Sequence, residues 1–529
     1  MENNLDQNIQ SSILPQDEPI PPFAPVHPQP PMPMSRRARW GKQLMAGKLL
    51  WQQTLPEWFA TYAIASYAIA LGVVNFVNSS YAIEWYFGLF GIVWVVGFFM
   101  LSVNFSKEWN ERHVRKQKAF EKKLFVTGLT IRMVYALFIY YFYINVNGKP
   151  YEFSAADSEG YVQTAQWLVE EWNKDNLWNT ITSYAQVAFS DIGYPLAILL
   201  PIRMFDENSA LLVIRLLHGF FGAYIAVLIY RLTFRTINET TARMAGIFCM
   251  LHPILICYVG LTLKEILMTW ILVLFIDFAD RMLRNKRYSF ATIAPVVVSG
   301  LSLFMFRTVI GMIAFMAIGF SLVMLDSRIV STGKKIALGV VLVGILMLSV
   351  SENIMNEIHK ISFSEAQKQQ ETSLEYRYGE KKSGKLGNSY AKYAGAAVFA
   401  PLIFTIPFPT MVATEGQEDM RLIHGGNWVR NVVSGFVILA MFMLLLTGEW
   451  KKYTLPLAMM LGYLLMLAFT QFAHSLRFHI PVMPFEMMFA AYAITNLRKK
   501  HRNWYLIWCI FMVVTCIGWN WIKLKGRGL

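Results

Sequence analysis

The stretch "MAGIFCMLHPILICYVGLTL", Met244–Leu263, decides the fold because it contains no aspartate, glutamate, lysine or arginine. A helix of about 20 apolar residues spans the ~30 Å hydrocarbon layer of a membrane. Comparable uncharged windows recur along the chain at Trp58–Ile83, Trp85–Ser106, Tyr288–Phe306 and Asn503–Ile522. The composition agrees, since 55% of the 529 residues are hydrophobic and only 16% are charged, against about 25% charged in soluble domains. The sequence therefore predicts an all-α, polytopic membrane protein.

The net charge of +14 lies mostly in short basic runs between the apolar windows. Basic residues gather in the cytoplasmic loops of membrane proteins, and the chain has no recognisable base-reading motif. We therefore expect membrane lipid, and not nucleic acid, as the partner of these basic runs. The four cysteines lie inside apolar windows without metal-binding spacing, and we interpret them as core residues.

The most basic linker, Ser106–Lys123, is expected on the cytoplasmic side. The next span then leads outward, so that residues 145–210 form a large external loop with short surface helices. Continued in this way, the chain makes about 13 transmembrane helices with a cytoplasmic amino terminus. The predicted segments are a disordered proline-rich cytoplasmic tail (1–57), two additional spans with the basic linker (58–123), a membrane module that includes the loop (124–353), an external and partly re-entrant loop (354–427) and the C-terminal spans (428–529).

Two carboxylates, Asp157 and Glu159, stand in "SAADSEGYVQTAQWL" (Ser154–Leu168), at the start of a predicted external helix whose apolar face includes Tyr161. One interpretation is capping, in which Ser154 or Asp157 accepts from backbone N–H groups and the helix dipole stabilises Glu159. The other is chemistry, with Asp157 as a general base that takes a proton from a hydroxyl. Glu159 would then tune that base or help it to hold a divalent cation, Mg or Mn. The spacing alone leaves both interpretations open.

Several ionisable residues fall inside predicted spans, where a charge is costly unless it is paired or hydrated. They are Arg132, Arg215, Asp277, Asp280 and Glu486. Asp277 and Arg281 stand four residues apart, which predicts an ion pair along one helix. Glu486 is the exception, since its position in the outer half of a span would allow it to face a cavity.

Three motifs follow the acidic pair in order: "GYPLAILLPIRMF" (Gly193–Phe205), "MLHPILICYVGLTLKEILMTWILVLF" (Met250–Phe275) and "LRFHIPVMPFEMMFAAYAI" (Leu476–Ile494). Over residues 124–500 this order resembles the GT-C superfamily of membrane glycosyltransferases, in particular the bacterial branch similar to protein mannosyltransferases and lipid A aminoarabinose transferases. The resemblance implies that Asp157 is the catalytic base. It also implies a polyprenyl-phosphate-linked sugar as donor and a glycan, lipid or protein as acceptor, on the outer face of a bacterial inner membrane. The chain departs from the family pattern in its Asp-Ser-Glu acidic pair and its two additional spans.

A phosphate leaving group needs cations close to the sugar that is transferred. The predicted outer side offers Lys264 in "TLKE", Arg307 in "FRT" and Arg477 in "HSLRFHIP". Plainer interpretations are a solvated hairpin pair for Lys264 and Glu265, and snorkelling to lipid headgroups for Arg307. Further candidates for supporting the site or binding the acceptor are Tyr161, Glu265, Arg421, His424, His474 and His479. The last two histidines lack a third ligand in the sequence for zinc.

Two other classes of protein stay open. A polysaccharide polymerase or O-antigen-ligase-like enzyme would rely on Arg421 and His424 more than on Asp157. A transporter or flippase for lipid-linked sugars would need a charge-lined passage, whereas most carboxylates outside the tail and linkers gather in the predicted external regions. The sequence has no nucleotide-binding motif, so an activated donor would have to supply the energy of transfer.

Overall fold

The computed structural model describes residues 85–111, 117–153, 155–285, 289–324, 421–469, 476–497 and 502–525, with a few single positions between 62 and 73. The chain divides into two units, Met1–Lys48 and Leu49–Leu529, and every described residue belongs to the second. All regular elements in this part are helical, as predicted. The predicted tail (1–57), most of the first additional span and residues 354–420 lie outside the described residues.

The helices follow the predicted apolar windows and the loop between them. The first half contains α3 (Trp85–Glu111), α4 (Gln117–Asn147), α5 (Ala156–Asn173), α6 (Leu177–Ala188), α7 (Gly193–Met204), α8 (Glu207–Thr236), α9 (Glu239–Leu251), α10 (Pro253–Cys257) and the 3₁₀ turn η2 (Tyr258–Gly260). The second half contains α11 (Glu265–Asn285), α12 (Phe290–Phe306), α13 (Thr308–Met324), α19 (Arg421–Thr447), η5 (Glu449–Tyr453), α20 (Thr454–Phe469), α21 (Leu476–His479), η7 (Ile480–Val482), α22 (Met483–Asn496) and α23 (Arg502–Lys525).

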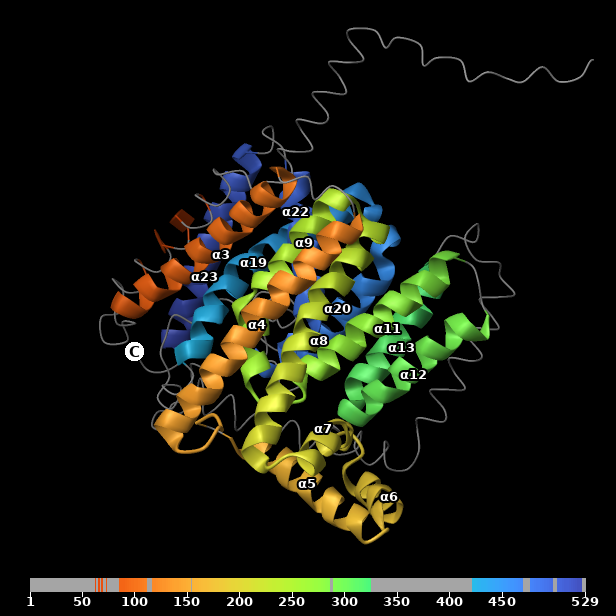
Figure 1. The fold of residues 1–529 in the computed structure, drawn as a ribbon. Coiled ribbons are helices and arrows are strands. Elements are labelled where there is room, and N and C mark those ends of the chain that lie inside the picture. The colour runs from red at the N-terminus through yellow and green to blue at the C-terminus, as the bar shows by residue number, and fades with distance from the viewer. Residues whose placement is uncertain are drawn as a thin grey trace, which may run out of the picture. The chain divides into compact units, whose positions relative to one another are not determined.

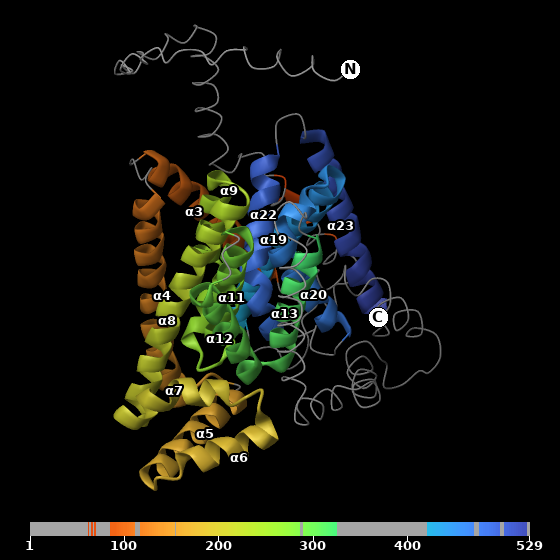
Figure 2. The ribbon, with the colours of Figure 1, turned by 90° about the vertical axis from the view of Figure 1, so that its right-hand side faces the viewer.

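The core of this unit is a helix bundle with a layer of short helices across one end. Helix α8 packs against α4, α9 and α11, while α22 packs against α9 and α19. Figures 1 and 2 both show α5, α6 and α7 lying together below the ends of α4 and α8. We call this the loop end of the bundle and the opposite one the far end. The predicted loop therefore forms an ordered helical layer that α7 joins to α8 and α12.

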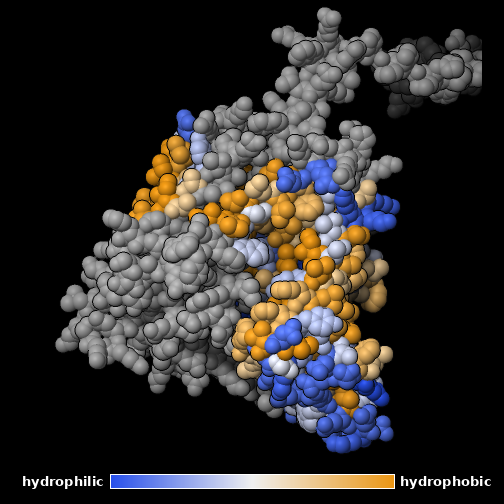
Figure 3. Space-filling model, turned by 60° about the vertical axis from the view of Figure 1, so that its left-hand side comes forward, coloured by the Kyte–Doolittle hydropathy of each residue, from blue (hydrophilic) through white to orange (hydrophobic). Residues whose placement is uncertain are grey.

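The described helices support a membrane protein. Helices α4 and α8 are each long and apolar enough to cross a membrane. Two bent pairs would also qualify if each formed one span: Glu239–Leu251 with Pro253–Gly260, bent by 51°, and Val432–Thr447 with Glu449–Leu467, bent by 118°. Figure 3 shows an apolar band on one face with hydrophilic residues gathered towards both ends. The larger count, about 13 spans, stays a prediction.

Helix α9 ends where Pro253 follows His252. The proline ring disfavours the helical conformation for the preceding residue, and His252 is extended, with φ −62° and ψ 118°. The break leaves carbonyls at the end of α9 without helical partners. The buried Arg132 side chain on α4 donates to the carbonyls of Met250 and Cys249, each at 3.0 Å. The span that was predicted to be uninterrupted is therefore bent. Arg132 is buried there because it donates hydrogen bonds to the carbonyl groups that the bend leaves without helical partners.

Two helix boundaries differ from the predicted segments. Helix α8 begins at Glu207, inside the range predicted as loop, because the Asp206 side chain accepts from the backbone N–H of Ser209 at 3.2 Å and caps the helix. Helix α19 begins at Arg421, so residues 421–427, the last part of the predicted external loop, are helical.

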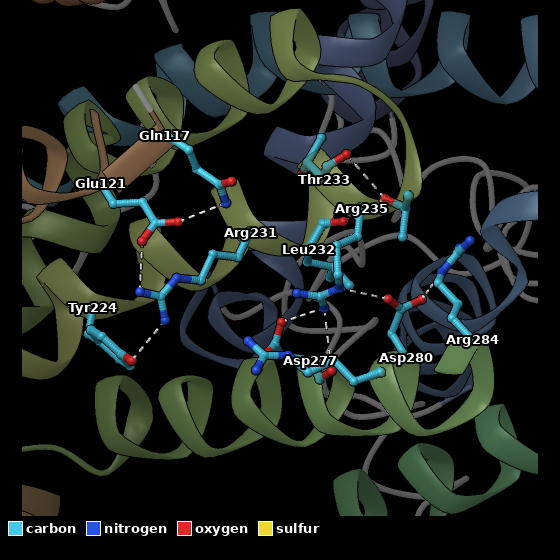
Figure 4. Close-up of polar contacts among 12 residues, drawn as sticks. Gln117, Glu121, Tyr224, Arg231, Leu232, Thr233, Arg235, Asp277, Asp280 and Arg284 are labelled. Carbon is cyan, nitrogen blue, oxygen red and sulfur yellow. Dashed lines mark hydrogen bonds and ion pairs between the residues drawn. The ribbon is translucent and has the colours of Figure 1, made fainter. Parts of the chain in front are cut away.

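An ion-pair network joins α4, α8 and α11 at the far end (Figure 4). Arg231 donates to Glu121 at 2.8 Å. Arg235 contacts two carboxylates on α11, Asp277 at 2.5 Å and Asp280 at 3.3 Å. The predicted pair of Asp277 and Arg281 is confirmed, with a distance of 2.7 Å. These charges are acceptable in the bundle because each has a partner.

Candidate functional site

The site begins at the amino end of α5, where Asp157 and Glu159 occupy the first turn. The N-cap is Ala155, which makes no side-chain capping hydrogen bond, so capping by Asp157 is not found. The carboxylates remain favourably placed near the positive end of the helix dipole. Helix α5 is held in place through its buried apolar face, at Val162, Ala165 and Leu168. The acidic turn therefore has a fixed position at the loop end.

Arg477 is the residue that joins Asp157 to the bundle. Its Nη1 pairs with Asp157 and its Nε pairs with Glu265, the first residue of α11. These partners are 320 and 212 residues away along the chain. Burial by itself would lower the pKa of Arg477, but the carboxylates of Glu265 and Asp157 raise that pKa above its ordinary value. Arg477 is therefore a cation at any physiological pH.

The two carboxylates that hold Arg477 differ in solvent access. The Glu265 side chain is 0% exposed, whereas that of Asp157 is 63% exposed. Removing one partner of a buried pair costs about 3–5 kcal/mol because it leaves a charge unpaired. An exposed pair is screened by water and contributes only about 0.2–1 kcal/mol. Glu265 is thus the strong partner of Arg477 and Asp157 the weak one.

Lys264 lies next to this group and is buried, with 4% of its surface exposed. Its ammonium pairs with Asp191, donates to the carbonyl of Phe306 at 2.8 Å and lies 5.8 Å from the ring of Tyr161. The interpretation of Lys264 and Glu265 as a solvated hairpin pair is therefore wrong. Folding brings the segments before α7 and α13 against the turn before α11, and this contact buries both residues.

Arg307 stands between α12 and α13, as the "FRT" motif predicts, and is the C-cap of α12. Its Nη1 donates to the hydroxyl of Tyr463 on α20 at 3.3 Å. Its guanidinium lies 4.3 Å from the ring centre of Phe478, the neighbour of Arg477 in the chain. Arg307 is half-buried by these contacts. The three predicted cations thus lie around one short helix and the start of α11.

The segment before α5 is fixed by residues outside the predicted site. Arg215 on α8 is fully buried and donates to the carbonyl of Pro150. Glu152 accepts from the hydroxyl of Ser158, in the turn that carries Asp157. Burial raises the pKa of Glu152 above its ordinary value. These contacts set the path of the chain into α5 and therefore the position of Asp157.

Glu152 and Asp191 are the site residues that the sequence interpretation missed. Both lie in the predicted external loop, but neither belongs to a motif. Asp191 comes just before "GYP", at the start of a motif that does carry the resemblance. Glu152 has no comparable signal, because its importance comes from burial and from the contact with Ser158.

The remaining candidates are only partly described. His479 is buried, with 3% of its surface exposed. Arg421 and His424 belong to α19, but their side chains lie outside the described part of the structure, and His474 lies outside the described residues altogether. Glu486 does not stand alone, since it is buried and lies 3.6 Å from Arg430.

The described residues do not assemble a divalent-cation centre. They contain no group of three or more histidine, cysteine, aspartate or glutamate side chains suited to a metal ion. Of the two carboxylates predicted to hold the cation, Asp157 already contacts Arg477. Glu159 is the other. Mg and Mn prefer several oxygen ligands, and the described residues by themselves do not supply such a set.

Comparison of the chain with known protein families, with curated proteins and with solved structures found no match. Function must therefore be argued from the geometry of the loop end. There Arg477, held through its Nε by Glu265, presents terminal nitrogens in a fork suited to a phosphate. An exposed carboxylate lies in contact with that fork, and a carboxylate of this kind can accept a proton from a hydroxyl.

Proposed function

We propose that the protein is a membrane glycosyltransferase with a GT-C-like fold that uses a polyprenyl-phosphate-linked sugar as donor. The observation that carries the proposal is the contact between Asp157 and Arg477. The sequence suggested one as a base and the other as a phosphate ligand, from motifs in different halves of the chain. A glycosyl transfer from a phosphate needs these two groups on either side of one sugar. Their contact supports the proposal because it brings both groups to the same place.

In the proposed reaction, the acceptor hydroxyl attacks the anomeric carbon of the donor sugar. The bond between that carbon and the phosphate oxygen breaks, and the electron pair stays with the phosphate. Asp157 takes the proton of the attacking hydroxyl. Arg477, with Arg307 and Lys264 close by, stabilises the negative charge that develops on the phosphate. A single displacement of this kind inverts the configuration at the anomeric carbon.

The proposed orientation places the loop end on the non-cytoplasmic face, with the amino terminus in the cytoplasm and about 13 spans in all. The distribution of basic residues supports this orientation. The far end holds Arg231, Arg235, Arg281, Arg284, Lys451 and Lys452. Such a surface suits the cytoplasmic leaflet, whose lipids are anionic. The acceptor would be a glycan, a lipid or a protein, and the membrane a bacterial inner membrane.

The test is sugar transfer by purified full-length protein in lipid nanodiscs, offered a panel of polyprenyl-phosphate-linked hexoses and pentoses. Release of polyprenyl phosphate is measured, because that product forms whichever acceptor is used. Asp157→Asn should leave the protein folded, by size-exclusion chromatography, and should slow release by about 10²–10⁴-fold. Glu159→Gln is the matched control, since it removes one negative charge from the same helical turn. Near-normal release by Asp157→Asn would overturn the assignment.

The same assay distinguishes the proposed glycosyltransferase from a polysaccharide polymerase or ligase. A polymerase or ligase would lose activity on Arg421→Ala or His424→Ala while tolerating Asp157→Asn. The proposed mechanism predicts the reverse order of sensitivity. A transporter or flippase would move the donor across the membrane of a proteoliposome without releasing polyprenyl phosphate.

A further inference from the structure

The side chain of Arg477 has one permanent and one replaceable partner. Its Nε pairs with Glu265, which is fully buried and whose second oxygen, Oε2, has no hydrogen-bond partner among the described residues. Its Nη1 pairs with Asp157, most of whose side chain is exposed. Loss of the first contact would leave a buried carboxylate uncompensated. Loss of the second would leave a carboxylate that water can solvate.

This asymmetry fixes one end of the guanidinium and leaves the other available for exchange. The Nε of Arg477 stays with Glu265 at the start of α11, while its Nη1 contacts Asp157 in the first turn of α5. Arginine binds phosphate through two parallel N–H donors, a geometry that matches its binding of carboxylate. A phosphate that reaches this place would therefore compete directly with Asp157 for the same donor atoms.

The contact also affects the proposed base. While Oδ2 of Asp157 accepts from Arg477, a hydroxyl that approaches this carboxylate must share it with the guanidinium. The whole carboxylate becomes available to a hydroxyl only when another anion takes over Arg477.

We propose that the donor phosphate displaces Asp157 from Arg477, so that binding of the donor releases the catalytic base for the acceptor. This inference rests on the proposed function and adds to it the order in which the two substrates bind. The donor binds first, because its phosphate breaks the contact between α5 and α21. The acceptor hydroxyl follows and finds Asp157 free. No covalent bond changes in this step, in which one anionic partner of Arg477 replaces another.

The experiment measures binding of polyprenyl phosphate, the leaving group, to the full-length protein in nanodiscs of zwitterionic lipid. Asp157→Asn removes the competing carboxylate and should bind polyprenyl phosphate more tightly than wild type, by roughly five-fold if the exposed pair contributes its usual free energy. Glu159→Gln removes an equal charge two residues along the same helical turn. This variant should bind polyprenyl phosphate less tightly than Asp157→Asn does. Arg477→Lys keeps the charge without the fork and should weaken binding.

The outcomes separate the exchange from the function on which it rests. If wild type binds polyprenyl phosphate but Asp157→Asn binds no more tightly than Glu159→Gln, the exchange is refuted while the proposed function stands. If neither wild type nor any variant binds, the phosphate site and the proposed function fail together. A parallel arm replaces polyprenyl phosphate with an anionic phospholipid. Equal binding of the two would overturn the assignment of the exchange to a donor phosphate.

Discussion

The two ends of the bundle each contain an arginine that bridges two carboxylates, and they use it differently. At the far end Arg235 bridges Asp277 and Asp280, which are 1% and 5% exposed and which also pair with Arg281 and Arg284, each at 2.7 Å. At the loop end Arg477 bridges the buried Glu265 and the exposed Asp157. The first network is closed, since every carboxylate has two partners, and it fastens α8 to α11. The second is open on one side, which allows a ligand to enter it.

The largest expected difference concerns the two bridging arginines. Arg477→Ala leaves Glu265 buried without a partner and should lower the free energy of unfolding by about 3–5 kcal/mol. Arg235→Ala should cost less, about 1.5–3 kcal/mol, because Asp277 and Asp280 keep Arg281 and Arg284. Denaturant titration of the purified proteins in detergent measures both. Equal losses would remove the distinction between an open and a closed network.

Restoring charge balance provides a control for this prediction. Glu265→Gln combined with Arg477→Ala removes both members of the buried pair and should recover most of the lost stability. The double variant should still fail to bind polyprenyl phosphate. Recovery of binding together with stability would show that Arg477 has only a structural role.

Substitution of one carboxylate at each end of the bundle should separate an effect on stability from an effect on activity. Asp277→Asn loses charged hydrogen bonds in a buried place and should cost about 1.5–3 kcal/mol, with turnover per folded molecule unchanged. Asp157→Asn should cost less than about 1 kcal/mol, because its pair with Arg477 is screened by water, yet it should slow transfer by about 10²–10⁴-fold. Unfolding and transfer measured on the same preparations test this, and a fully active Asp157→Asn variant would contradict it.

A backbone contact at the loop end gives a third test. A Cβ on Gly193, the first residue of α7, would lie 2.9 Å from the carbonyl oxygen of Met305 and 2.9 Å from the ring of Phe306. Gly193→Ala should therefore push α7 away from α12 and lower the free energy of unfolding by about 1–3 kcal/mol. Gly160→Ala on α5 meets nothing within 4 Å and should stabilise the protein by up to about 1 kcal/mol. Equal effects from the two alanines would mean that the close approach does not matter.

The smallest effect concerns Glu152 and depends on pH. Burial raises the pKa of Glu152, so the folded protein binds this proton more tightly than the unfolded chain, and the resulting stability is present at low pH and is lost as the pH rises through the folded-state pKa. Glu152→Gln still accepts from Ser158 but carries no charge. Its melting temperature should exceed that of wild type increasingly as the pH rises above the ordinary pKa of a glutamate. Glu170→Gln, on the exposed face of α5, should show no such trend.

Local features of the chain could be predicted because each is encoded within a few residues. Uncharged windows predicted α3, α12 and α23, and four-residue spacing predicted the pair of Asp277 and Arg281 on α11. The turn at Arg307 lies where two apolar windows meet. The bend after α9 was missed although Pro253 was visible, because the length of the apolar window alone suggested one continuous span.

The sequence by itself determined that the chain is helical, that some of its helices are long and apolar enough to cross a membrane, and which side chains had the chemistry for a site. Only the tertiary structure decided which of them meet. Asp157 and Arg477 are 320 residues apart, and their contact depends on how α5, α11 and α21 pack at the loop end. Solvent access was decided in the same way, since Lys264 and Glu265 look solvated in sequence and are buried by neighbouring segments. Hydrophobic periodicity is a local property, whereas the burial that makes one partner of Arg477 permanent and the other replaceable arises only when distant segments pack together.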